Sequence, residues 1–118
     1  MTTISARTPM IDWSRGFNRH WYRKNPAVTH AFNALSFLFP QGERYFIDVA
    51  REVGRDLDYS QNPELEHDVS AFITQESAHS HQHNQYNEIL EAQGFENVAH
   101  KFIQQLQEQS PALAPEPA

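Results

Sequence analysis

The chain has 118 residues with a formal net charge of −6, seven histidines and no cysteine. This length supports one domain, and the acidic balance argues against nucleic acid as the main partner, because phosphate binding depends on an excess of lysine and arginine. Without cysteine, disulfides, thiolate catalysis and cysteine-bound metal centres are excluded. The most apolar run, residues 31–39, is too short for a transmembrane segment and the N-terminus lacks a signal-peptide layout, so we expect a soluble, cytoplasmic protein.

Residues 1–24 are predicted to form an arm ahead of the first helix. Its second half, DWSRGFNRHWYRK at residues 12–24, mixes two tryptophans with four basic residues and a histidine. We interpret it as a capping segment whose aromatic side chains pack on the core. A lid, or a patch that contacts a substrate or a membrane surface, is the alternative.

Two short helices are predicted next, separated by a proline. Asn25 followed by Pro26 is typical of an N-cap and a first helical residue, and predicts a helix that runs to about residue 38. Pro40 is predicted to end this helix, because the residue before a proline avoids the helical backbone conformation. A second helix is then predicted over residues 41–57.

A long helix follows, and its ends are marked in the same way. Asn62 and Pro63 repeat the cap-and-proline start, and Gly94 is a good left-handed residue after the last turn. A last amphipathic segment has one apolar side, made of Phe95, Ala99, Phe102 and Leu106. No segment alternates with period two, so the fold class is all-α, a helical bundle with a helical metal-binding domain at residues 25–109. Residues 110–118 have the composition of a disordered tail.

The long helix carries the unusual stretch QESAHSHQHNQYN, residues 75–87. On a helical wheel, Glu76, His79 and His83 lie on the apolar stripe of this helix, whereas His81 lies about 140° away and faces outward. The apolar members of the stripe are Leu65, Val69, Phe72, Ile73 and Leu90. The glutamate and the two histidines therefore occupy core positions.

The predicted helix at residues 41–57 shows a similar interruption, at Glu43. The other positions of its seam are Phe39, Phe46, Ala50, Val53 and Leu57. A lone buried carboxylate costs several kcal/mol and tends to take up a proton. Since the lysines and arginines do not lie on these two faces, a metal ion is the natural counter-charge. A buried or partly solvated polar layer without metal is the alternative.

The ligand types narrow the choice of metal. Glu-x-x-His on one helix and a glutamate on a neighbouring helix form half of the ligand set of ferritin-like di-iron and di-manganese proteins. Carboxylate and imidazole suit Fe(II), Mn(II) or Zn(II). We expect a divalent metal, with iron first and manganese or zinc as alternatives.

The segments FPQGERYF at residues 39–46 and FITQESAHSHQHNQYN at residues 72–87 resemble the family called predicted metal-dependent hydrolases. Members carry Phe-Pro-x-Gly-Glu and, one helix later, Gln-Glu-x-x-His-x-x-x-His-x-x-x-Asn. Both motifs match here in order and spacing, and the resemblance covers about residues 15–95. The resemblance implies a ferritin-like bundle. The metal-binding positions that it implies are Glu43, Glu76, His79 and His83. Gln75 and Asn87 would support these ligands or the structure around them.

Members of this family are longer, with a further helical region that carries another acid and a helix rich in glutamate and histidine. The resemblance is therefore to the N-terminal half of the family. It implies either a fragment of a longer protein or a C2 homodimer in which two chains share the metal site, and we favour the dimer. Glu96 and His100 lie off the apolar side of the last segment and are not predicted as ligands.

Three functions are compatible with such a site. The first, preferred on ligand chemistry, is an oxidoreductase that activates dioxygen at a di-iron or di-manganese centre. The second is a hydrolase that uses a metal-bound water to attack a small-molecule substrate, with His83 or Glu76 as the candidate catalytic group. The third is non-enzymatic, a metal-binding or structural helical dimer.

Overall fold

The structure, a computed structural model, describes residues 3–109. These residues form three α-helices, a short 3₁₀ turn and no β-strand, which confirms the all-α prediction. The elements are α1 (Pro26–Asp56), η1 (Tyr59–Gln61), α2 (Pro63–Ala92) and α3 (Val98–Gln109). The tail predicted at residues 110–118 lies outside the described residues.

Helices α1 and α2 begin where the sequence predicts. The Asn25 side chain accepts a hydrogen bond from the Val28 backbone N–H, and the Asn62 side chain accepts one from Leu65, with a proline after each cap. These bonds satisfy amides that the first helical turn leaves free. Helix α2 ends just before Gly94, whose φ of 91° is a conformation that glycine adopts without strain.

Helix α1 continues through Pro40, so the prediction that one helix ends there and another begins at residue 41 is wrong. A proline inside a helix has no N–H to offer to the carbonyl four residues earlier, which here belongs to Ser36. That carbonyl accepts a hydrogen bond of 3.0 Å from the Asn87 side-chain Nδ2 on α2. A contact between the helices therefore satisfies the group that the proline leaves free.

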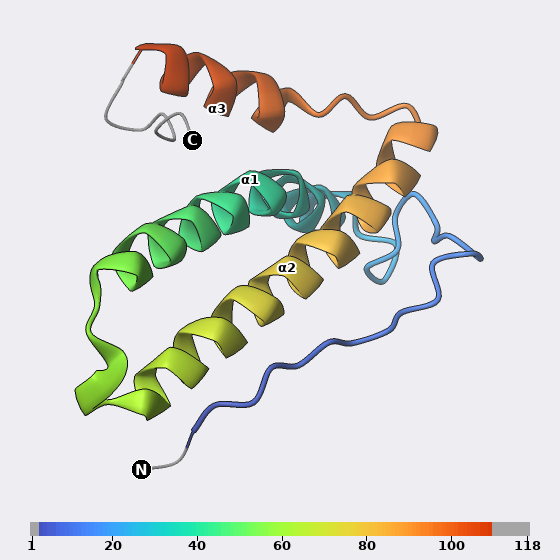
Figure 1. The fold of residues 1–118 in the computed structure, drawn as a ribbon. Coiled ribbons are helices and arrows are strands. Elements are labelled where there is room, and N and C mark those ends of the chain that lie inside the picture. Colours follow the sequence, from blue (N-terminus) through green and yellow to red (C-terminus); the bar gives the residue numbers. More distant parts are fainter. Residues whose placement is uncertain (1–2, 110–118) are drawn as a thin grey trace.

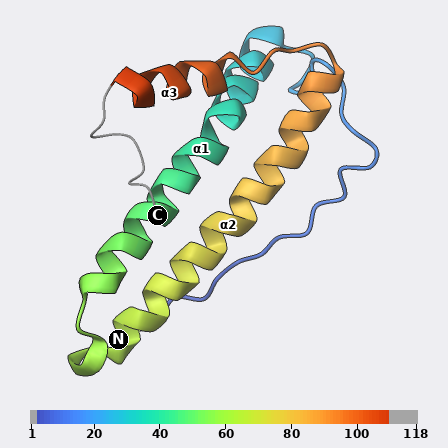
Figure 2. The same cartoon turned by 45° about the horizontal axis from the view of Figure 1, so that its top comes forward.

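Helices α1 and α2 form an antiparallel hairpin joined by η1 (Figures 1 and 2). Helix α3 follows the end of α2 and lies across the N-terminal part of α1 (Figure 2). Within the described part of the chain, no helix combines the length and the apolar character that crossing a membrane would require.

The first part of the N-terminal segment, residues 3–17, lies along α2 on the side away from α1, and the chain then turns back to the start of α1 (Figure 2). This first part runs in the same direction as the helix. Near its start, the Ile4 backbone N–H donates to the Asp68 carboxylate at 2.9 Å. Further along, the Phe17 and Tyr86 rings stack with centroids 4.5 Å apart. The segment thus covers one side of α2 with backbone hydrogen bonds and aromatic rings.

The apolar core of the described chain is small. Its buried hydrophobic side chains are Phe37, Ile47, Ala71 and Leu90. The seam predicted as core on the second half of α1 is open to solvent, with Phe46 55% and Val53 53% exposed. The prediction that this seam is buried is therefore wrong for a single chain. The radius of gyration, 17.3 Å, also exceeds the about 13–14 Å expected for a compact domain of this length.

Most of the exposed apolar side chains along α1 and at its C-cap form a stripe, called here the α1 stripe. They recur every three or four residues, which is the spacing of a helix–helix seam, except between Phe39 and Phe46, where Gly42 and Glu43 take the intermediate place. The members of the α1 stripe are Phe32, Leu35, Phe39, Phe46, Val49, Val53 and Leu57.

Candidate metal centre

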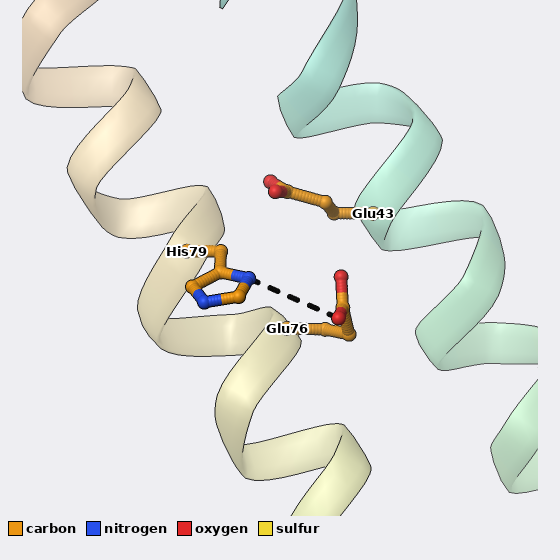
Figure 3. Close-up of side chains that lie close together, drawn as sticks. All are labelled: Glu43, Glu76 and His79. Carbon is orange, nitrogen blue, oxygen red and sulfur yellow. Dashed lines mark ion pairs between the residues drawn. The ribbon is translucent and has the colours of Figure 1, made fainter. Parts of the chain in front are cut away.

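Three side chains from the two long helices meet near the middle of the hairpin. Glu43 comes from α1, and Glu76 and His79 come from successive turns of α2 (Figure 3). Each offers one ligand atom, and these atoms all lie within 4.8 Å of one another. The His79 Nδ1 lies 3.8 Å from the Glu76 Oε1. The three groups could therefore hold one cation between the helices.

Glu43 lies in an environment that disfavours its charge. The residue is 8% exposed, and its Oε2 is buried without a hydrogen-bond partner. Burial, and after it the negative charge of Glu76 opposite, raises the pKa of Glu43 to about 7. Among the described residues, no lysine or arginine pairs with either carboxylate. A cation would supply the missing positive charge and a partner for the unpaired oxygen.

His83 flanks this cluster one turn further along α2. Its Nε2 lies 3.9 Å from the Glu43 Oε1, and the edge of the Phe39 ring packs against it with centroids 4.8 Å apart. Burial, and after it the nearby His79, lowers the pKa of His83, so the imidazole is neutral at pH 7. The contact with Glu43 therefore joins a neutral ring to a carboxyl group and is not an ion pair.

The other ring nitrogen of His83 faces two buried polar side chains. The Ser36 Oγ lies 3.0 Å from the His83 Nδ1 and 2.7 Å from the Asn87 Oδ1. The spacing of the histidine motif gave no indication of Ser36, which lies on the other helix. The one local signal was its position four residues before Pro40, where a carbonyl loses its helical partner.

A family model described as "predicted metal-dependent hydrolase" matches residues 5–115. The chain belongs to this family. The match includes both segments from which the resemblance was inferred and extends beyond them, so the predicted family is confirmed. No curated protein and no solved structure matches the chain.

Membership of this family indicates a dependence on metal, and Glu43, Glu76 and His79 form a group of ligand types that could hold an ion. Of the four positions predicted as ligands, the structure brings these three together and places His83 beside Glu43. Gln75, predicted to support the ligands or the structure around them, accepts a hydrogen bond from the Arg7 backbone in the N-terminal segment.

The remaining acids and histidines near the motif have other surroundings. His81 is exposed, as predicted from its position on the wheel. Glu96 forms an ion pair with Lys101, and the His100 ring contacts the Gln41 side chain. None of these groups joins a cluster of three ligand types within the described residues.

Proposed function

We propose that this chain is a metal-dependent hydrolase that binds a divalent cation between α1 and α2 through Glu43, Glu76 and His79. The observation that carries the proposal is the approach of these three ligand groups to within 4.8 Å of one another in a partly buried site. The unpaired, buried Oε2 of Glu43 supports a cation at this donor set. Carboxylates with one imidazole suit Fe(II), Mn(II) or Zn(II), and iron is our first expectation.

A divalent cation in this position would lower the pKa of a water molecule and polarise an ester or phosphate oxygen. His83 is the group best placed to take a proton there, because it is neutral and its Nε2 lies 3.9 Å from Glu43. The Phe39 ring packs against the His83 ring with centroids 4.8 Å apart. Glu76 lies next to His79, which favours a role as a ligand over one as a base.

A second copy of the chain is expected to complete the centre. The α1 stripe is centred about 60° around the helix from Glu43, so it runs directly beside the metal ligands. One copy supplies half of a di-metal carboxylate set, and two copies related by a C2 axis supply four carboxylates and two histidines. A homodimer would also bury the α1 stripe, which a single chain leaves in water.

The neighbourhood of Glu43 leaves room for this second copy. Gly42 precedes Glu43 on α1, and no atom lies within 4 Å of the position that a Cβ would occupy there. Another helix can therefore approach the backbone closely at the height of the cluster.

The cytoplasmic location inferred from the sequence stays a prediction.

Activation of dioxygen is the second candidate function. It is favoured by the same donor set, because glutamates with Glu-x-x-His motifs are the ligands of di-iron and di-manganese helical bundles. A non-enzymatic metal-binding or structural dimer is the third. The three functions differ in the metal bound, in reactivity with oxygen and in turnover.

The first test is elemental analysis with native mass spectrometry on protein without a histidine tag. We compare the wild type with Glu43→Gln and His79→Ala, and use His81→Ala as the control because His81 is exposed. We expect a metal that is lost in the first two variants and kept in the third. Phosphatase or esterase turnover then supports the hydrolase, whereas an oxygen-dependent change in the absorption of bound iron supports the redox function. A folded wild type that binds no metal would refute all three.

The second test addresses the dimer. Phe46→Glu and Val53→Glu place a charge in the α1 stripe, and we expect either variant to shift the protein from dimer to monomer in light scattering. Arg51→Glu is the control, since Arg51 is an exposed residue of α1 about 140° around the helix from the centre of the stripe. A monomeric wild type, or a dimer that only the control disrupts, would contradict the proposed partner surface.

A further inference from the structure

A short chain of hydrogen bonds links the Ser36 carbonyl on α1, which Pro40 leaves free, to His83 on α2. Its members Ser36 and Asn87 are each 5% exposed, so water does not compete for their polar groups. The chain runs from the Ser36 carbonyl to Asn87, from Asn87 to the Ser36 hydroxyl, and from that hydroxyl to His83. Each hydrogen bond in the chain determines which group donates and which accepts in the following one.

The first link fixes the orientation of the Asn87 amide. The Ser36 carbonyl can only accept, so the Asn87 group that lies 3.0 Å from it is the NH₂. Pro40 makes this acceptor available, because it has no N–H to donate to that carbonyl. With its nitrogen so placed, Asn87 presents its Oδ1 to the Ser36 Oγ at 2.7 Å.

The second link fixes the hydroxyl proton. The Asn87 Oδ1 can only accept, so Ser36 donates its single hydroxyl hydrogen to Asn87. The Ser36 Oγ is then left with lone pairs alone to offer to the His83 Nδ1, 3.0 Å away. A hydrogen bond between these two atoms requires the proton to be on Nδ1.

The last step concerns the opposite nitrogen of the ring. A neutral imidazole carries one proton, so with Nδ1 protonated the Nε2 has a free lone pair. Nε2 is the atom that lies 3.9 Å from the Glu43 Oε1, on the side of the metal cluster. In the other tautomer a hydrogen would point at that site, and the ring could neither bind a cation nor accept a proton there.

We propose that Ser36 and Asn87 are positioning residues that hold His83 in the Nδ1–H tautomer and so direct a free Nε2 lone pair at the Glu43 side of the metal site. The tautomer itself follows from the hydrogen bonds of this chain. Its use as a metal ligand or as a base rests on the proposed function. The proposal also gives a structural reason for Pro40 and Asn87 in this chain.

The test measures the tautomer directly in metal-free protein by long-range ¹H–¹⁵N NMR at about pH 8, where a histidine of ordinary pKa is neutral. His83→Gln identifies the signals of His83. We expect Nδ1–H in the wild type and in Ser36→Thr, which keeps the hydroxyl, and a loss of this preference in Ser36→Ala. Ser77→Ala is the control, because Ser77 lies on α2 and bonds only to its own helix at Ile73. A wild-type ring protonated on Nε2, or an unchanged tautomer in Ser36→Ala, would overturn the proposal.

Calorimetric titration with Zn²⁺ provides the second readout. Loss of a group that orients a metal-binding histidine weakens metal binding by about 10–100-fold, which we expect for Ser36→Ala, with recovery in Ser36→Thr. Unchanged zinc affinity together with a released tautomer would refute the positioning role. A wild type that shows the Nδ1–H tautomer but binds none of Zn²⁺, Mn²⁺ and Fe²⁺ would instead refute the proposed function. If Ser36→Ala does not fold, the wild-type tautomer alone decides.

Discussion

Replacing Glu43 with glutamine should stabilise the metal-free protein above neutral pH while it destroys the metal site. The pKa of Glu43 is about 7 in the folded chain against 4.5 for an ordinary glutamate. Between these two pH values the folded chain keeps a proton that the unfolded chain has lost, so the stability of the wild type falls as the pH rises through this window. Glutamine has nearly the same shape and no charge, so the variant escapes this loss.

The size of the effect follows from the difference between a pKa of about 7 and one of 4.5. At about 1.4 kcal/mol per pKa unit, the upper limit is about 3.5 kcal/mol. The glutamine NH₂ group has to find an acceptor in a buried place, which offsets part of the gain. We therefore expect Glu43→Gln to be more stable than the wild type by about 1–3 kcal/mol at pH 8 and equally stable near pH 5.

The assay is urea unfolding in the presence of a chelator, at a fixed protein concentration because association adds to the apparent stability. Glu52→Gln is the control, since Glu52 is an exposed glutamate on the same helix. The control should show no gain that grows with pH. Two results would contradict a raised pKa of Glu43. In one, Glu43→Gln is no more stable than the wild type at alkaline pH. In the other, its gain in stability does not increase between acid and alkaline pH.

Three further outcomes are expected. Pro40→Ala restores a helical N–H opposite the Ser36 carbonyl and should raise stability by about 1–3 kcal/mol in thermal unfolding; a decrease would show that α1 requires the proline. Leu90→Ala removes the only fully buried large apolar side chain in the described chain and should cost about 2–4 kcal/mol in urea unfolding, with an effect below 1 kcal/mol arguing against the hairpin packing. Chelation of the metal should lower the melting temperature and shift the protein from dimer to monomer in sedimentation. A dimer that chelation does not affect would show that association does not depend on the metal.

The helix starts were predictable from the sequence because their causes are local. A capping asparagine and the proline after it act within one turn, as Asn25 and Asn62 show. The effect of Pro40 was not predictable in this way. Whether a proline ends a helix depends on whether the freed carbonyl finds another donor, and here that donor is Asn87, on a different helix.

The metal cluster was largely predictable, because positions that share a face are set by helical periodicity alone. Glu76 and His79 had to lie together, and Glu43 was the one acid in the seam of the neighbouring helix. Ser36 escaped notice since a serine on an apolar helix face has no distinctive pattern. Its importance comes from contacts with residues about fifty positions away, and these exist only once α1 and α2 pack together.

The exposed seam of α1 shows a different kind of disagreement between sequence and structure. The periodicity of residues such as Phe46 and Val53 is that of a buried surface, yet in the single chain these side chains face water. The sequence pattern predicts that this seam is buried, whereas the single chain leaves it exposed. The two agree if another molecule covers the seam. The same seam runs beside Glu43, whose Oε2 has no hydrogen-bond partner. The exposed apolar surface and the unpaired carboxylate oxygen therefore lie at one place. One association of two copies would satisfy both, which is a stronger reason to expect a dimer than either feature gives alone.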